Sequence, residues 1–417
     1  MATQDRDFDL VLWGATGFTG RLTAEYLLRT YGTDTFRWAL GGRSGSKLDL
    51  VRQGIARDTG VDSTGLEIVL GDAGDAASMA ALAGRTCVVC TTVGPYALYG
   101  SELVAACARA GTHYCDLTGE VAWMRRMIDA HQDEAAASGA RIVHASGFDC
   151  IPADLGVWFV QREFKARYGV ASPHVKLRVA GFKGGGSGGT FASGLNMLEE
   201  ASRDPEIARL LADPYALNPK GQATGADGPD RNAPVWDADF EQWTGPSVMT
   251  PVDTRVVRRT NALTGHAYGP DFRFDEAMLT GAGPMGFAKA AALAAGLTTV
   301  MSALTLAPVR RLAASRLPKP GEGPDQATRE SGYWDVRLHA AHPSDPAKSL
   351  GARLTGDRDP GYGSTSKMLG ESAVCLALDP LASPGGFLTP ATAMGDPLLA
   401  RLQQNAGVTA EIETERA

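Results

Sequence analysis

A glycine-rich turn near the start of the chain constrains the fold more than any other feature. Its glycines are spaced GxxGxxG over residues 14–20, directly after an apolar run at 9–13 and at the start of a helix-like run. Glycine is needed there because the backbone bends sharply and approaches a pyrophosphate closely, while the helix N-terminus offers free N–H groups. The pattern predicts a dinucleotide site that includes Gly14, Thr16, Gly17, Phe18, Thr19 and Gly20.

The strand–turn–helix order repeats through the first 150 residues. Apolar segments alternate with Ala- and Leu-rich stretches of helical spacing, and the segments lie at 36–41, 66–70, 87–93, 112–117 and 141–145. Strands that alternate with helices indicate βαβ units and a parallel sheet. We therefore expect an α/β protein whose residues 1–150 form a Rossmann-type, doubly wound domain, with its ligand at the carboxyl ends of the strands.

The pattern changes after residue 150. Alternating segments at 175–182, 333–341 and 349–355 predict a second α/β domain with a mostly antiparallel sheet over 151–360. Within it, residues 213–270 are rich in Pro, Gly, Asp and Asn, which favours long loops. Residues 361–417 are expected to pack back on the Rossmann domain, as a helix over 364–378 and a surface tail over the last thirty residues.

Charge and composition exclude several classes of function. The chain has 40 basic and 47 acidic residues and a net charge of −7, which argues against nucleic-acid binding, because phosphate contacts need a basic surface. Six cysteines lack the spacing of a disulfide framework, and the seven histidines are scattered, so no metal site is predicted. The polar N-terminus has no secretory segment, which predicts a cytoplasmic location.

The end of the second predicted strand distinguishes between the two nicotinamide dinucleotides. NAD-binding proteins usually have Asp or Glu there, whereas this chain has Arg43, followed by Ser44 and Lys47. An acidic side chain repels a 2′-phosphate, and a guanidinium binds it with two hydrogen bonds. We therefore predict NADP(H), with stacking of Arg43 on the adenine as the alternative.

The next two strand ends extend the predicted cofactor site. Asp72 ends the third strand, where it either bonds the adenine or simply stabilises a turn. Val93, Gly94 and Pro95 end the fourth strand and are expected to lie against the ribose and nicotinamide, with Tyr96 towards the reacting end.

Five motifs occur in an order that resembles the saccharopine dehydrogenase-like oxidoreductases. They are Gly14–Gly20, Gly42–Arg43, Thr92–Tyr96, Tyr114–Glu120 and Ser146–Asp154. Within that group the chain is most similar to the enoyl reductase branch. The resemblance is specific over the first 155 residues and looser through 185–193 and 361–378.

This resemblance implies reduction by NADPH of a carbon–carbon double bond conjugated to a thioester, in lipid or polyketide assembly. Hydride then adds to the β-carbon, and the site must stabilise an enolate and protonate the α-carbon. Tyr96, Tyr99 and Asp149, the last paired with Cys150, are the candidate catalytic residues, and the glycine run at 184–189 is a candidate source of N–H donors. The alternatives are that Tyr96 only packs over the cofactor, and that Asp149 or Asp154 caps a helix at the interdomain hinge.

Three other functions stay open or are disfavoured. A saccharopine-type imine reductase needs an arginine clamp for carboxylates, and Arg178, Arg255, Arg258 and Arg259 show no spacing that marks one. A short-chain dehydrogenase needs Tyr-x-x-x-Lys, which is absent. The third is a protein that binds NADP(H) without turnover on a membrane or lipid surface.

One apolar segment bears on that last alternative. Residues 290–309 carry no charge and precede Arg310, Arg311, Arg316 and Lys319. The length would just span a bilayer, but the composition is mostly Ala, Thr and Ser. Three interpretations remain: a buried helix or subunit interface in a homodimer, peripheral membrane contact through 285–319, and a membrane span.

Overall fold

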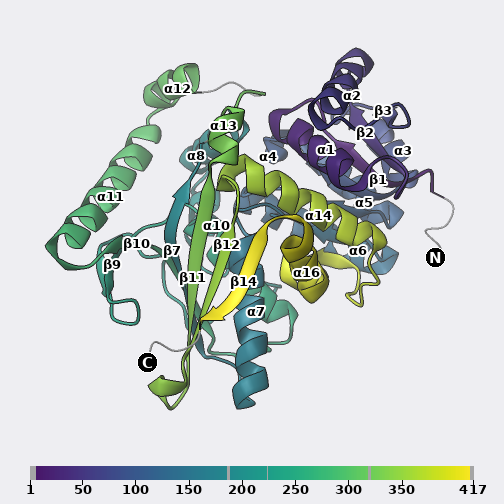
Figure 1. Ribbon diagram of the computed structural model, residues 1–417. Helices are drawn as coiled ribbons and strands as arrows, with labels where there is room; N and C mark the ends of the chain where they lie inside the picture. The colour runs from purple at the N-terminus through teal and green to yellow at the C-terminus, as the bar shows by residue number, and fades with distance from the viewer. Residues whose placement is uncertain (1–5, 186–187, 223, 318–320, 414–417) are drawn as a thin grey trace.

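The computed structural model describes residues 6–185, 188–222, 224–317 and 321–413, which form two seven-stranded sheets (Figure 1). The first sheet has the order β13-β6-β5-β4-β1-β2-β3, and every pair in it is parallel. This confirms the doubly wound α/β prediction. The strands are β1 Phe8–Trp13, β2 Trp38–Gly42, β3 Glu67–Leu70, β4 Thr86–Thr91, β5 His113–Cys115, β6 Arg141–Val143 and β13 Gly386–Leu388.

Helices on both faces connect these strands. Each begins after the carboxyl end of a strand, as right-handed βαβ crossovers require. They are α1 Phe18–Tyr31, α2 Gly45–Thr59, α3 Ala76–Gly84, α4 Tyr96–Tyr99, α5 Ser101–Ala110 and α6 Val121–Ser138.

The second sheet has the order β14-β12-β11-β7-β10-β9-β8 and is antiparallel except for the β7–β10 pair. A mostly antiparallel second sheet is therefore confirmed. Its strands are β7 His174–Lys183, β8 Val235–Asp237, β9 Gln242–Gly245, β10 Arg273–Gly281, β11 Tyr333–Ala341, β12 Leu350–Gly356 and β14 Val408–Glu413. Its helices are α7 Ile151–Tyr168, α8 Gly188–Arg203, α9 Pro205–Ala212, α10 Thr250–Leu263, α11 Gly283–Leu304, α12 Ala307–Arg316 and α13 Gln326–Glu330.

The prediction of a surface tail over the last thirty residues is wrong. This region forms α15 Pro390–Ala393, α16 Gly395–Asn405 and β14, which pairs with β12 across the second sheet. The predicted helix at 364–378 is confirmed as α14 Thr365–Leu378, which lies beside α1 (Figure 1). The domain limits at 150 and 360 stay predictions.

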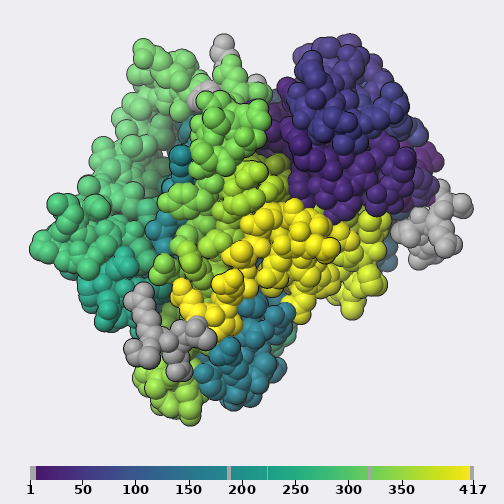
Figure 2. Space-filling model, in the orientation of Figure 1, coloured from purple at the N-terminus to yellow at the C-terminus, as the bar shows by residue number. Residues whose placement is uncertain are grey.

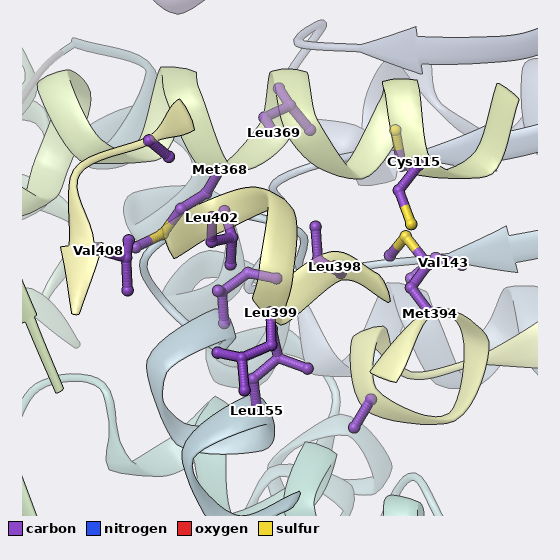
Figure 3. Close-up of a cluster of buried hydrophobic side chains, with 14 of the residues drawn as sticks. Cys115, Val143, Leu155, Met368, Leu369, Met394, Leu398, Leu399, Leu402 and Val408 are labelled. Atoms are coloured by element: carbon purple, nitrogen blue, oxygen red, sulfur yellow. The ribbon is translucent and has the colours of Figure 1, made fainter. Parts of the chain in front are cut away.

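The C-terminal region joins the two sheets through a shared core (Figure 3). Cys115 and Val143 of the first sheet pack in one cluster with Leu155 of α7 and with side chains of α14 and α16. The latter include Met368, Leu369, Leu398, Leu399 and Leu402. Because close-packed interiors resist deformation, this core fixes the carboxyl edge of the first sheet against the second sheet.

The prediction of loops over 213–270 is wrong for α10. Twelve of its fourteen residues are buried, including Arg255, Arg258 and Arg259. The sequence is polar because the partners of these arginines are buried with them, so hydrophobic periodicity does not mark the helix.

Candidate functional site

The glycine turn lies at the point where the strand order reverses, between β1 and β4. Gly14 has φ +90°, and a β-carbon there would come within 2.6 Å of the Val93 side chain. Thr92 Oγ1 donates to the Gly14 carbonyl oxygen at 3.1 Å. A β-carbon on Gly20 would collide with that same carbonyl and lie 2.8 Å from Thr92 Oγ1. The turn can therefore close against β4 only with glycine at both positions.

The start of α1 is open to a ligand. Gly17 occupies its N-cap and has no side chain to bond the first N–H groups, and Thr16 is exposed. Free N–H groups at a helix N-terminus attract phosphate. The predicted turn residues from Gly14 to Gly20 are thus brought together at one strand end, although their contact with a cofactor stays a prediction.

Elements from the second half of the chain cover this turn. The Phe18 ring makes an edge contact with Tyr362, with centroids 5.2 Å apart, and Arg329 lies 5.5 Å over it. Tyr362 belongs to a π-helical turn at Pro360–Ser364, and its hydroxyl shares a hydrogen bond of 2.7 Å with Thr190 of α8. The candidate site therefore lies between the first sheet and α8.

Arg43, Ser44 and Lys47 are also brought together, at the start of α2. Ser44 caps this helix by accepting from the Lys47 backbone N–H at 3.4 Å. Arg43 is exposed and has no ion-pair partner within the described part of the chain. An unpaired guanidinium beside a helix N-terminus is suited to a phosphate group.

Asp72 has a local structural role. Its Oδ1 accepts from the Gly74 backbone N–H at 3.0 Å, which forms an Asx turn after β3. This geometry favours the turn interpretation, and adenine binding by Asp72 stays a prediction.

The segment after β4 is held by a glutamate that the sequence interpretation missed. Glu120, 1% exposed, accepts from the backbone N–H groups of Tyr96 and Ala97, both at 2.9 Å. Gly94 faces α8, because a β-carbon on it would lie 3.5 Å from Ser193 Oγ. Burial raises the pKa of Glu120. Val93, Gly94 and Pro95 are thus fixed at the edge where the nicotinamide is predicted.

The two candidate tyrosines have different environments. Tyr96 is buried, its hydroxyl donates to the Thr91 carbonyl at 3.2 Å, and burial raises its pKa well above the usual value. This favours the alternative that Tyr96 packs rather than donates a proton. Tyr99, at the end of α4, is 46% exposed.

Asp149 lies between the ends of β5 and β6 and the side of α10. A β-carbon on Gly119 would be 3.8 Å from Asp149 Oδ2 and 3.9 Å from Val252. Desolvation raises the pKa of Asp149 to about 6, which suits a group that exchanges protons near neutral pH. Its catalytic role stays a prediction.

The capping alternative for Asp149 and Asp154 is wrong. Cys150 holds the N-cap of α7, with no side-chain cap bond. Asp154 points instead to Thr260 and accepts from the Ala391 backbone N–H at 2.8 Å. It therefore joins α7 to α10 and α15.

A second carboxylate that the sequence interpretation missed orders the loop after β5. Asp116, 0% exposed, accepts from Tyr114 at 2.8 Å, pairs with His144 Nδ1 at 2.7 Å and accepts from two backbone N–H groups. Both missed acids, Asp116 and Glu120, lie in the motif at 114–120, which carried the only sequence signal for them.

The four arginines considered for a clamp are all engaged within the protein. Arg178 pairs with Asp237 and Asp275, both at 2.7 Å, and Arg258 pairs with Asp227 at 2.7 Å. Arg255 pairs with Asp230, and Arg259 donates to the carbonyls of Leu217 and Phe387. The contacts of Arg178 join strands of the second sheet, and those of the other three hold α10 in place, so none of the four is free for a substrate carboxylate.

Comparison with known proteins agrees with this geometry. Residues 10–143 match the family model of the saccharopine dehydrogenase NADP-binding domain. Trans-acting enoyl reductases of Mycobacterium tuberculosis and Mycobacterium ulcerans are each 40% identical to the chain, over 98% of both proteins. A further M. tuberculosis protein, provisionally given the same name, is 42% identical over the same share.

The fold also has a solved counterpart. Saccharopine dehydrogenase (L-Glu forming) from Saccharomyces cerevisiae superposes with a TM-score of 0.52 and 12% identity, over 97% of this chain and 99% of that one. The chain has an NADP-binding domain and belongs to the saccharopine dehydrogenase-like family, in the branch of the mycobacterial trans-acting enoyl reductases.

Proposed function

We propose that this protein uses NADPH to reduce the carbon–carbon double bond of an enoyl thioester or a similar lipid-like substrate. The observation that carries this is the 40–42% identity to trans-acting enoyl reductases over 98% of the chain. The turn at Gly14, the free Arg43 and the acid Asp149 all lie after strands of one parallel sheet, whose carboxyl ends share an edge.

The residues present fit an NADP(H) molecule. Gly14 and Gly20 let the turn close against β4, Gly17 leaves the first N–H groups of α1 without a side-chain cap, and Arg43 is an exposed guanidinium without an ion-pair partner among the described residues. We infer that the start of α1 binds the pyrophosphate and that Arg43, Ser44 and Lys47 bind the 2′-phosphate. When bound, NADPH supplies the hydride.

The chain's own residues must then supply one proton to the α-carbon of the substrate. Asp149 is the best-placed acid, because its pKa of about 6 leaves part of it protonated near neutral pH. Tyr99, half exposed at the end of α4, is the second candidate. Backbone N–H groups near Gly184, Gly185 and Gly189 are candidates for holding the thioester oxygen, and Gly186 and Ser187 lie outside the described residues.

Two alternatives are less well supported. An imine reductase of dicarboxylic amino acids would need free arginines, and the four considered are occupied. A non-catalytic NADP(H)-binding protein would leave the partly buried acid Asp149, with its raised pKa, without a role.

The direct test is NADPH oxidation, followed by absorbance, with short and long enoyl thioesters beside a mixture of aminoadipate semialdehyde and glutamate. Turnover of a thioester supports the proposal. Turnover of the amino-acid mixture alone would establish imine reduction instead. Binding of NADPH without turnover of either would favour the binding protein.

A second proposal concerns the apolar segment, which forms α11 and α12 at the outer edge of the molecule (Figure 2). By length and composition α11 is apolar enough to cross a membrane, and only 11% of its most apolar window is buried. The interpretation of this segment as a helix buried within the chain is therefore wrong. Met285, Val300, Leu306 and Leu312 are 54–68% exposed.

We propose that α11 and α12 contact an anionic lipid surface, while the rest of the protein lies in the cytoplasm. Residues 277–321 contain five basic and no acidic residues, in a chain of net charge −7. Basic residues near an anionic surface each contribute about 1 kcal/mol. Arg310→Glu with Arg311→Glu should abolish sedimentation with phosphatidylserine vesicles. Unchanged sedimentation would refute lipid contact, and a dimer that dissociates in this variant would establish a subunit interface instead.

A further inference from the structure

An arginine from the second half of the chain lies over the start of α1. The guanidinium carbon of Arg329 is 5.5 Å from the centre of the Phe18 ring, and Phe18 is the first residue of that helix. Arg329 belongs to α13, which lies beside the start of α1 (Figure 1). The start of α1 is also the proposed pyrophosphate site. A cation that the first sheet does not provide therefore stands at this site.

Close contacts hold the segment around Arg329 against α1. Gly323 lies so near the Phe18 ring that an added β-carbon would come within 2.4 Å of it. The Arg329 guanidinium donates to the Pro324 carbonyl oxygen at 2.6 Å. The Arg329 carbonyl oxygen accepts from the Asp359 backbone N–H at 3.1 Å. Because the backbone is anchored before, at and after this residue, the guanidinium stays beside the α1 N-terminus.

Most of the hydrogen-bonding capacity of Arg329 is not used within the protein. The side chain is half-buried, forms no ion pair among the described residues and donates there to one carbonyl oxygen. Asp325 and Asp359 lie nearby, but their carboxylates accept from backbone N–H groups at 2.7–3.1 Å. A guanidinium carries several N–H donors in a fixed fork, so most of them are left for a ligand.

The pyrophosphate needs more positive charge than α1 supplies. Each of its two phosphates carries a negative charge, whereas a helix N-terminus supplies about half a positive charge. The glycine turn contains no basic residue, and Arg21, the first one in α1, pairs with Asp58 at 2.6 Å. Arg43 and Lys47 follow a different strand, β2, where the 2′-phosphate is proposed to bind. A guanidinium suits the remaining charge, because it binds phosphate with two parallel hydrogen bonds.

We propose that Arg329 is a cofactor-binding residue that contacts the NADPH pyrophosphate, together with the N–H groups at the start of α1. This inference rests on the proposed function, which assigns the pyrophosphate to α1. The dinucleotide is then held by both halves of the chain, by the glycine turn after β1 and by α13. NADPH and NADH share the pyrophosphate, so Arg329 contributes equally to the binding of both, whereas Arg43 contributes to NADPH alone.

Cofactor titrations distinguish Arg329 from Arg43. In Arg329→Gln the Kd values for NADPH and NADH should both rise by the same factor, about tenfold or more, because both cofactors lose the contact. Adenosine 2′-phosphate has no pyrophosphate, so its Kd, measured by competition with NADPH, should not change. Arg43→Glu should instead weaken the binding of NADPH and adenosine 2′-phosphate and spare NADH. An unchanged Kd for NADPH in Arg329→Gln would overturn the inference.

Two further variants separate phosphate binding from packing on Phe18. Arg329→Lys keeps the positive charge but loses the planar group, and Arg329→Met keeps a side chain that packs on the ring but loses the charge. Phosphate binding predicts partly restored NADPH affinity in Arg329→Lys and weak affinity in Arg329→Met. Near wild-type affinity in Arg329→Met, with none restored in Arg329→Lys, would assign Arg329 to packing and overturn the inference.

Arg353→Gln is the matched control, because it removes the same charge from the second sheet. The Arg353 side chain is 44% exposed and pairs with Asp335 of β11 at 2.8 Å. The Kd for NADPH should therefore stay at the wild-type value in this variant. An equal loss of affinity in Arg353→Gln and Arg329→Gln would mean that only net charge matters, and would overturn the contact.

Phosphorus NMR at saturating NADPH locates the contact without turnover. In Arg329→Gln the pyrophosphate resonances should shift while the 2′-phosphate resonance stays in place, and the opposite pattern would overturn the inference. NADPH that binds through Arg329 without reduction of any thioester would overturn the proposed reaction alone. Reduction of a thioester with unchanged NADPH affinity in Arg329→Gln would overturn the inference alone.

Discussion

Charge reversal at Arg43 should change the cofactor preference without changing the fold. Arg43 is exposed and makes no ion pair within the described chain, so Arg43→Glu should alter the free energy of unfolding by no more than about 0.5 kcal/mol. A hydrogen bond between charged groups contributes about 1.5–3 kcal/mol. At about 1.4 kcal/mol per tenfold, loss of the 2′-phosphate contact weakens NADPH binding about 10- to 150-fold.

NADH lacks the 2′-phosphate, and its ribose hydroxyl can donate to the new carboxylate, so NADH affinity should hold or improve. Fluorescence titration with NADPH and with NADH measures both dissociation constants. Arg57→Glu is the matched control, because Arg57 lies at the far end of α2 and its side chain is 77% exposed. An unchanged Kd for NADPH in Arg43→Glu would refute the assignment of Arg43 to the 2′-phosphate.

Three further substitutions test the site and its support. Gly20→Ala should lower the free energy of unfolding by about 1–3 kcal/mol and weaken NADPH binding. Gly84→Ala, whose added β-carbon would meet nothing within 4 Å, should do neither. Equal losses of stability in urea unfolding would contradict the inference that Gly20 is needed for close approach to the Gly14 carbonyl. Tyr96→Phe should lower stability by about 1 kcal/mol and leave kcat intact, and a large loss of kcat would restore its catalytic role. Arg178→Met removes one charged partner from Asp237 and one from Asp275, which keep Lys176 and His174 respectively, and should cost about 1.5–3 kcal/mol. Desolvation raises the pKa of both aspartates, but Arg178 and Lys176 outweigh it at Asp237, and His174 and Arg178 outweigh it at Asp275, so both pKa values are lowered. Wild-type stability from this cluster therefore holds above about pH 4 and is lost as the pH falls. In Arg178→Met the midpoint of thermal unfolding should fall less steeply at acid pH than in the wild type. An unaltered pH dependence of that midpoint would contradict the role of Arg178.

The sequence predicts those features that depend on neighbouring residues. The glycine spacing at 14–20 reflects a local turn and its contact with the next strand ends, and the alternation of strands and helices is a periodic pattern. Arg43 follows its strand directly, so its place at the start of α2 follows from chain order alone.

Contacts between distant segments decide the remaining features. β13 has only three residues, and its pairing with β6 joins residues more than 240 positions apart, so no periodic pattern reveals it. The buried arginines of α10 look like surface residues until their partners at 227 and 230 fold over them.

The candidate acids show the same division. Asp149 stands out in the sequence because it lies in a motif at a strand end. The buried acids Asp253 of α10 and Glu276 of β10 do not, because a carboxyl group gains its altered proton affinity only when folding removes water and sets another charge beside it. The sequence alone therefore determined the nucleotide-binding half of the molecule and its strand ends, while tertiary packing decided which polar groups are buried together, because burial brings together side chains that are far apart in the chain.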